Sequence, residues 1–470
     1  MNPIAIIGAG ITGLAAAHAL RKKGLPFTIY EAGPRCGGVI QTRQSNGFTT
    51  EDGPNTLMET SSTISGLVQD LGLEDRKIYS SPSAAKRYIY RNGRTINVPS
   101  SVFGFVATPL FSASAKCRLA LEPFIGRAAS EESLATFVER RLGREFLDYA
   151  INPLVGGIYA GDPKALSVRH AFPKLHALEQ RYGSLIKGQI LGARERRQRG
   201  TVSKQNAKKF SFTGGLQTLI DALQFQLGDA IELQSRVTSL ECFGGEWMIN
   251  RATPHGDRMC GHSAVLCTAP AHKIGEMAWP WPQREEIRAV AKIPYSPVAT
   301  LSLGFRREDV AHPLDGFGVL VPEAESLSIL GAIFSSSLFP GRAPEGHVLL
   351  TLYFGGARAP SLAGESENTL TELAVLDLRK VLGVRANPVF RSLRAFSKAI
   401  PQYNMDYAAP LAAMERIENQ APGMFFAGNF REGISLGDAI VAGHHAASRV
   451  ERFLALENRS WESANPAAVP

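Results

Sequence analysis

The chain has 470 residues, 44% hydrophobic and 20% charged, which is long enough for two or more folded units and excludes a disordered chain or a fibrous protein. Its net charge of +8 favours an anionic partner: a membrane surface, a carboxylated or phosphorylated ligand, or nucleic acid. Five widely spaced cysteines without a CxxC pair predict neither a disulfide framework nor a zinc site, so we expect no metal.

The first elements predict a dinucleotide-binding unit. An apolar strand at 4–7, a helix at 14–21 and a strand at 27–30 enclose Gly8, Gly10 and Gly13 in a GxGxxG pattern. The first glycine permits a tight turn, the second lets the backbone approach a pyrophosphate, and the third allows the helix to pack on the strand. Glu31 ends the second strand, where an acid accepts ribose hydroxyls. Because residues 1–3 lead directly into the first strand, we expect no cleaved leader.

The segment after Glu31 indicates which dinucleotide is bound. Arg35, Gly37 and Gly38 follow the ribose acid closely. This second glycine pair resembles the extended fingerprint of FAD-dependent amine oxidases and their relatives.

Residues 95–205 predict a helical region that contacts a membrane surface. The stretch 95–115 has no charge, but Pro99 and Pro109 interrupt it, so we expect it to lie on a membrane or inside the protein rather than to span a bilayer. The basic run 194–200 predicts an exposed loop that is solvated or faces anionic lipid. No aromatic residues interleave it, which argues against nucleic acid.

The end of the chain predicts a return to the nucleotide-binding unit. A strand at 264–270 and another at 424–428 are followed by a helix that opens within 433–438. The positive end of that helix would stabilise negative charge on a reduced flavin. We therefore expect the first and last segments to lie side by side in one domain.

An ordered series of segments indicates the family: 51–56, 86–93, 121–124, 152–157, 161–163, 212–219, 316–322 and 427–429. With these segments the chain resembles the protoporphyrinogen oxidases, in particular the plant mitochondrial-type enzymes, over nearly its whole length. Since it has no transit peptide, we expect a bacterial member.

The resemblance implies an α/β fold with three parts. The first is a Rossmann-like FAD domain of p-hydroxybenzoate-hydroxylase type, formed by residues 1–75, 206–270 and 396–460. The second is an antiparallel-sheet substrate domain, formed by residues 76–94 and 271–395. The third is a helical membrane-docking insertion at 95–205.

The resemblance also implies the chemistry. Non-covalent FAD would accept hydride from protoporphyrinogen IX in a six-electron oxidation to protoporphyrin IX, and dioxygen would be reduced to hydrogen peroxide, within haem synthesis. The protein would sit peripherally on the cytoplasmic face of the inner membrane, with a homodimer and handover to the next enzyme as further associations. The implied FAD contacts are Gly8, Ala9, Gly10, Ile11, Thr12, Gly13, Glu31, Ala32, Arg35, Gly37, Gly38, Val39, Gly53, Pro54, Asn55, Thr56, Val237, Gly428, Asn429, Ile434, Ser435 and Leu436.

Substrate contacts follow from the same resemblance. Arg87 would grip a propionate through two parallel hydrogen bonds. Asn55 is the catalytic candidate, because its amide would position or polarise substrate beside the flavin; a turn asparagine bonding its own backbone is the alternative. The remaining substrate contacts would be Gly157, Leu320, Ile333 and Tyr353.

Three positions depart from related proteins. Asn429 stands where many flavoproteins have aspartate, and Ile333 and Tyr353 stand where the plant enzymes typically have leucine and phenylalanine. No convincing general base is evident, and we expect His444 and His445 to be packed or solvated.

Three other functions stay open at this point. The first is oxidation of coproporphyrinogen III, which has four propionates rather than two. The second is another FAD-dependent amine oxidase or desaturase reaction. The third is a catalytically silent FAD-binding partner protein.

Overall fold

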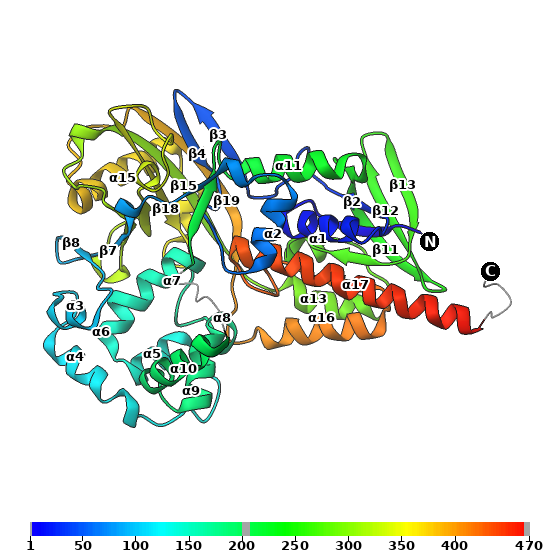
Figure 1. The fold of residues 1–470 in the computed structure, drawn as a ribbon, viewed down its shortest axis with the longest axis horizontal. Coiled ribbons are helices and arrows are strands. Elements are labelled where there is room, and N and C mark those ends of the chain that lie inside the picture. Colours follow the sequence, from blue (N-terminus) through cyan, green and yellow to red (C-terminus); the bar gives the residue numbers. More distant parts are fainter. Residues whose placement is uncertain (1, 200–206, 465–470) are drawn as a thin grey trace.

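A five-stranded parallel sheet forms the centre of one half of the molecule (Figure 1). The computed structural model describes residues 2–199 and 207–464. The sheet combines the beginning, middle and end of the chain. Its strands, in spatial order, are β10 (Ile231–Glu232), β2 (Phe27–Tyr30), β1 (Ile4–Ile7), β14 (Val265–Cys267) and β20 (Met424–Phe426).

Two long helices from opposite ends of the chain pack together on one face of this sheet. Helix α1 (Ile11–Lys22) is buried from Ile11 to Leu20, and α17 (Leu436–Ala464) lies along it (Figure 1). A Cβ at Gly443 of α17 would stand 2.3 Å from the carbonyl oxygen of Thr12, so a larger residue would separate the helices. The predicted juxtaposition of the first and last segments is confirmed. Helices α2 (Ser62–Asp70) and α11 (Gln217–Leu227) complete this layer.

The opposite face of the parallel sheet is covered by a second layer. Its core includes Trp247 and Ile249 together with the strand residues Ala5 and Ile7. The layer consists of the antiparallel strands β11 (Arg236–Phe243), β12 (Glu246–Thr253) and β13 (Gly256–His262) and of helices α12 (Ala271–Ile274), α13 (Gln283–Ala291) and α16 (Ala408–Gln420).

A seven-stranded mixed sheet forms the other half. Only the β16–β7 pair is parallel. Helix α15 (Glu367–Leu382) packs on one face through Leu370, Ala374 and Leu378. The strand order is β19 (Phe390–Pro401), β15 (Tyr295–Arg306), β18 (His347–Gly355), β17 (Gly331–Ile333), β16 (Gly316–Leu320), β7 (Lys86–Arg91) and β8 (Arg94–Asn97).

Small elements connect the two halves. The hairpin of β3 (Thr42–Ser45) and β4 (Phe48–Glu51) reaches the second sheet, where Phe48 stacks on Phe390 at 4.6 Å between ring centroids. A three-stranded sheet has the order β5 (Leu57–Met58), β9 (Lys209–Phe212) and β6 (Lys77–Tyr79), and α14 (Ser335–Leu338) lies beside it in space.

A helical unit spans residues 102–199 (Figure 1). The fully buried Arg141 holds it together through Glu122 and Glu179, each 2.6 Å away. Among the described residues, no helix is long and apolar enough to cross a membrane. The helices are α3 (Val102–Ala107), α4 (Ala113–Ala120), α5 (Leu134–Arg141), α6 (Arg144–Phe146), α7 (Asn152–Tyr159), α8 (Val168–Ala171), α9 (Pro173–Tyr182) and α10 (Leu185–Arg199).

The structure corrects the loop predicted at 194–200. Helix α10 continues through Arg199, because Arg, Gln and Glu are good helix formers and the run contains no helix breaker before Gly200. Residue 200 and the side chains of 193–199 lie outside what the structure describes.

The sheets also end at positions that differ from the expected boundaries. Strand β8 extends the second sheet to Asn97, past 94, and β19 extends it to Pro401, past 395. Residues 271–291 pack with the nucleotide-binding half, because Ile274, Ile287 and Val290 share its core. The division of the chain into three domains stays a prediction, and its boundaries change at these positions.

Candidate active site

The glycine loop after β1 leaves room for a ligand at one position only. Gly8 has φ +104°, and a Cβ at Gly13 would lie 2.1 Å from the Gly8 carbonyl oxygen, so both are required by the fold. A Cβ at Gly10, in contrast, would meet no atom within 4 Å. No side chain caps the N-terminus of α1, and its first turn contains no acid. The free N–H groups and the open space fit the pyrophosphate of a dinucleotide.

Glu31 joins the glycine loop to the end of β2. Its two carboxylate oxygens accept hydrogen bonds from the N–H groups of Ala9 at 2.8 Å and Gly33 at 2.7 Å. The remaining lone pairs lie beside the loop, at the carboxyl end of a parallel strand, where ribose hydroxyls bind in this architecture. Ala32 is exposed at this edge, and Val237 is buried at the start of β11 nearby.

The second glycine pair lies against the first. The N–H of Gly37 donates to the Ala9 carbonyl at 2.8 Å, and a Cβ at Gly38 would lie 3.5 Å from the Gly10 Cα. Arg35 fixes this loop by donating to the carbonyls of Cys36, Gly38 and Ile40. The two glycine segments of the sequence therefore form one binding surface.

The loop after Gly38 brings in the segment 53–56. A Cβ at Gly53 would stand 2.4 Å from the Val39 carbonyl oxygen, so only glycine permits this approach. Val39 is exposed, and Pro54 and Thr56 are half-buried on the same segment as Asn55.

The loop after β20 is held by a tyrosine that sequence reasoning did not identify. The Tyr403 hydroxyl donates to the Asn429 carbonyl and accepts from the Gly433 N–H at 3.1 Å. Gly428, at φ +142°, starts this loop. Ser435 caps α17, since its hydroxyl accepts from the Asp438 N–H at 3.1 Å, and Ile434 and Leu436 flank it. Asn429 therefore lies at the same sheet edge as Gly8 and Glu31.

The predicted substrate residues share one face of the second sheet. Register places Arg87 beside Gly318, and Ile333 is paired with both Gly318 and Thr351. The next row on this face is Ile89, Leu320, Gly331 and Tyr353.

The two faces of this sheet differ in burial. Residues of the opposite face, including Val319 and Leu352, are buried under α15, whereas Leu320, Ile333 and Tyr353 are half-buried. A half-buried apolar face turned toward the nucleotide-binding half fits a flat apolar substrate.

Helix α7 and the segment 53–56 border this face. A Cβ at Gly157 of α7 would stand 2.7 Å from the Leu320 Cδ2 atom, so the helix backbone passes directly over the sheet. Asn55 donates from Nδ2 to the Tyr353 hydroxyl at 2.7 Å, while its contact to the Gly53 carbonyl is long, at 3.4 Å. The amide is therefore not merely closing its own turn. Burial raises the pKa of Tyr353, which keeps its hydroxyl neutral.

A buried ion pair next to Asn55 was not identified from the sequence. Glu51 accepts hydrogen bonds from Thr42 at 2.7 Å and from the Leu216 N–H at 2.9 Å, and it pairs with Arg342 at 3.1 Å. Burial raises the pKa of Glu51, which Arg342 partly offsets. The segment 51–56 was recognised only as a matching motif, and nothing in the sequence around Arg342 marks it.

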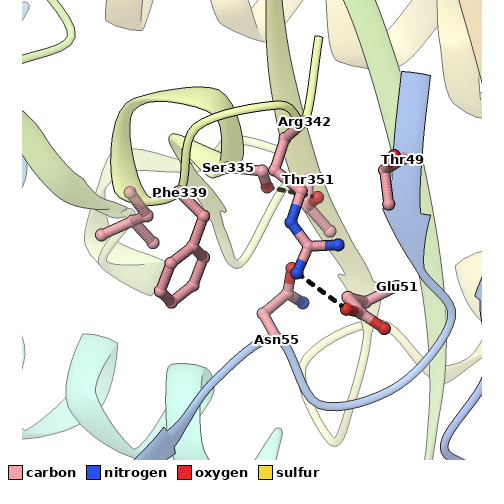
Figure 2. Close-up of a pocket in the computed structure, with 8 residues that line it drawn as sticks. Thr49, Glu51, Asn55, Ser335, Phe339, Arg342 and Thr351 are labelled. Atoms are coloured by element: carbon pink, nitrogen blue, oxygen red, sulfur yellow. Dashed lines mark hydrogen bonds and ion pairs between the residues drawn. The ribbon is translucent and has the colours of Figure 1, made fainter. Parts of the chain in front are cut away.

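Figure 2 shows this pair lining a small cavity together with Asn55. The cavity has a volume of about 10 Å³, enough for about one water molecule. The Nη1 atom of Arg342 is buried there without a partner among the described residues. The lining residues are Thr49, Glu51, Asn55, Ser335, Leu338, Phe339, Arg342 and Thr351.

Other titratable candidates lie away from this site. His444 and His445 are exposed on α17. All five cysteines are free thiols. Within residues 2–199 and 207–464, no three potential metal ligands come together.

Comparison with known proteins identifies the family. The family model described as flavin containing amine oxidoreductase matches residues 11–451. Protoporphyrinogen oxidase 2, chloroplastic/mitochondrial, from Arabidopsis thaliana is 37% identical, over 96% of this chain and 94% of the relative. Coproporphyrinogen III oxidase from Bacillus subtilis is 30% identical, over 96% of this chain and 98% of the relative.

A solved structure from Exiguobacterium sp. 255-15 shows the same fold. It superposes with a TM-score of 0.78 at 24% identity, over 96% of this chain and 98% of that chain. The family match, the relatives and the dinucleotide site agree. The chain belongs to the flavin containing amine oxidoreductase family and is an FAD-dependent oxidoreductase related to the protoporphyrinogen oxidases.

Proposed function

We propose that the protein oxidises protoporphyrinogen IX to protoporphyrin IX with dioxygen as the acceptor. Three molecules of dioxygen take up the six electrons and six hydrogens and leave as hydrogen peroxide. The observation that carries this proposal is the single sheet face that unites Arg87, Leu320, Ile333 and Tyr353 beside Asn55.

Each of these residues has a role that follows from its chemistry. FAD, when bound, accepts hydride from the substrate. Arg87 is exposed at the rim of the face, and its guanidinium has no hydrogen-bond or ion-pair partner among the described residues, so it is available to a propionate. Leu320 and Ile333 supply apolar surface for the tetrapyrrole. Tyr353 fixes the Asn55 amide in one orientation, which positions the substrate relative to the nucleotide-binding half.

Coproporphyrinogen III is the second candidate substrate. The relative from Bacillus subtilis is a coproporphyrinogen III oxidase at 30% identity over 96% of this chain, compared with 37% for the Arabidopsis protoporphyrinogen oxidase. Both substrates carry propionates that Arg87 can bind, so the residues described above serve either reaction.

One assay separates these functions. The purified FAD-loaded protein is mixed in air with each porphyrinogen, and porphyrin fluorescence and hydrogen peroxide are followed. We expect a kcat/KM for protoporphyrinogen IX well above that for coproporphyrinogen III. The reverse order would assign the second function, and absence of turnover with both, while a simple amine is oxidised, would refute both.

We also propose that the helical unit docks on the cytoplasmic face of the inner membrane as a peripheral contact. The nucleotide-binding half would then be a domain of p-hydroxybenzoate-hydroxylase type. Large apolar side chains are exposed on this unit: Phe103 at 89%, Phe124 at 84% and Ile190 at 68%. Lys116 and Lys187 stand beside them; Lys187 donates to the Pro123 carbonyl at 3.3 Å. Apolar side chains next to cations favour an anionic bilayer surface.

A further inference from the structure

Lys209 begins strand β9 and lies near the active-site segment. It is paired with Met58 of β5, only three residues after Asn55. Its carbonyl accepts from the Ser80 N–H at 2.9 Å, which links it to the segment that leads into β7 and Arg87. The backbone therefore places Lys209 between the nucleotide-binding half and the substrate sheet.

The side chains of β9 alternate between its two faces, and this alternation shows on which face the Lys209 side chain lies. Phe210 and Phe212 enter the core under α2 and α11. Ser211 points the other way, and its hydroxyl accepts a hydrogen bond at 2.7 Å from Arg342, which lines the cavity of Figure 2. Since side chains alternate along a strand, Lys209 shares the active-site side with Ser211.

Lys209 and Arg87 are two cations on the active-site side that no carboxylate of the described residues neutralises, and the charge of Arg87 acts on Lys209. Lys209 is half-buried; burial and then the charge of Arg87 lower its pKa. No carboxylate pairs with either side chain in the described part of the chain. Two like charges, one of them half-buried, repel each other, and an anion bound between them would relieve this repulsion.

Carboxylates neutralise the nearby Lys77 and Lys86, which sets Lys209 and Arg87 apart from them. Lys77 pairs with Glu59 at 2.9 Å and with Glu74 at 3.0 Å, and Lys86 pairs with Asp315 at 2.5 Å. Lys208 lies over the Tyr79 ring at 5.2 Å.

We propose that Lys209 and Arg87 form a two-point clamp that binds the propionates of two neighbouring pyrrole rings. The proposal rests on the proposed function in requiring a porphyrinogen, but not on which one, because both candidate substrates carry such a pair. Arg87 supplies a two-pronged contact to one carboxylate, and the ammonium of Lys209 supplies a point charge to the other. The tetrapyrrole then extends from this edge over Leu320 and Ile333.

The test compares two adjacent lysines in the FAD-loaded protein. Lys209→Met removes the charge and keeps the length of the side chain, and Lys208→Met is the matched control. For the free diacid porphyrinogen we expect Lys209→Met to raise KM roughly 10-fold with little change in kcat, and Lys208→Met to leave both unchanged. For the dimethyl ester, Lys209→Met should behave as the wild type. Wild-type kinetics of Lys209→Met with the diacid, or equal losses with diacid and diester, would overturn the clamp.

A binding measurement separates this proposal from the proposed reaction. Protoporphyrin IX and its dimethyl ester are titrated into each variant, and porphyrin fluorescence gives the Kd without turnover. We expect the diacid to bind more tightly than the diester in the wild type, and this preference to shrink in Lys209→Met. If that pattern appears in a protein that oxidises no porphyrinogen, the reaction is wrong and the clamp stands. Equal binding of diacid and diester by the wild type would refute the clamp.

Discussion

The Asn55 amide donates to the Tyr353 hydroxyl at 2.7 Å, although 298 residues separate them in the chain. This bond joins the segment beside the second glycine loop to the half-buried face of the seven-stranded sheet. The two halves of the candidate active site are thus linked by side chains as well as by the chain connections. The consequence is that the Asn55 orientation depends on a residue of the other half.

Tyr353→Phe should therefore weaken catalysis without removing FAD. The variant leaves Asn55 with only the long 3.4 Å contact to the Gly53 carbonyl. Loss of one hydrogen bond of about 1 kcal/mol corresponds to a roughly 5-fold lower kcat/KM with porphyrinogen. Tyr79→Phe, whose hydroxyl bonds Glu59 away from the site, is the matched control. Steady-state kinetics and flavin absorbance check both, and unchanged kinetics in Tyr353→Phe would show that Asn55 does not need this bond.

The two glycines of the first loop should respond differently to alanine. Gly13→Ala places a Cβ 2.1 Å from the Gly8 carbonyl and should lower the free energy of unfolding by about 1–3 kcal/mol. Gly10→Ala meets no protein atom within 4 Å, so the apoprotein should keep its stability to within about 0.5 kcal/mol. It should nevertheless bind FAD weakly, because the methyl group occupies the pyrophosphate position.

Urea unfolding of the apoproteins and titration with FAD measure the two effects. Acid precipitation should release the yellow cofactor into the supernatant, since we predict a non-covalent complex. Wild-type FAD affinity in Gly10→Ala would contradict the assigned pyrophosphate position.

Arg87→Ala should raise the KM for porphyrinogen. Losing a charge-assisted hydrogen bond of about 1.5–3 kcal/mol lowers kcat/KM by roughly 10- to 150-fold. Arg87→Lys should recover only part of this loss, because an ammonium cannot form the two-pronged contact. A substrate ester without free carboxylates should be insensitive to the change. Wild-type kinetics in FAD-loaded Arg87→Ala would remove Arg87 from the substrate site.

Membrane binding should depend on apolar side chains of the helical unit. The double variant Phe103→Ser/Phe124→Ser should bind anionic vesicles at least about 10-fold less than the wild type, since each buried phenylalanine contributes about 1.5–3 kcal/mol. Phe225→Ser is the control, because Phe225 is 90% exposed but lies on α11 of the nucleotide-binding half. Sedimentation with vesicles measures the difference. In cells, high salt with mild detergent should extract the protein, whereas resistance to carbonate would contradict a peripheral contact.

Acid should destabilise the fold through His262. Its Nδ1 donates to the Pro3 carbonyl and its Nε2 accepts from the Tyr30 hydroxyl, both at 2.9 Å, and burial lowers its pKa below the ordinary 6.5. The unfolded chain then binds more protons than the folded one, so stability is lost as the pH falls from 6.5 towards the folded pKa.

His262→Gln should flatten this dependence in unfolding measurements between about pH 7 and 5. His255→Gln, at an exposed position of the same half, should leave it unchanged. An unaltered slope in His262→Gln would assign the acid sensitivity to other groups.

Local signals in the sequence predicted the βαβ unit and the glycine loop that it carries. The turn at Gly8, the close packing at Gly13 and the acid at Glu31 are set within about thirty residues, and the βαβ unit forms as expected. Charge alone does not predict a loop at 194–199, because arginine favours helices and α10 continues through Arg199.

The proposed substrate-binding face depends on the pairing of strands that are far apart in the sequence, which no local pattern reveals. Arg87, Leu320 and Tyr353 were placed only by family resemblance, and their common face follows from the order β18, β17, β16 and β7. Glu51 and Arg342 form an ion pair although nearly three hundred residues separate them in the chain. The role proposed for Lys209 depends on Arg87, which is also distant in sequence. Such relationships arise from tertiary packing, which overrides local preference.

The position of β20 at the edge of the parallel sheet has a consequence for biosynthesis. Residues 424–426 complete a sheet whose other strands are made much earlier, and the loop that follows carries Asn429. Until residues 424–429 have been synthesised, the nascent chain exposes the edge of β14 and lacks the loop that carries Asn429. We therefore expect FAD to bind only after β20 has been made, and a chain terminated before residue 424 to present chaperones and proteases with an open sheet edge.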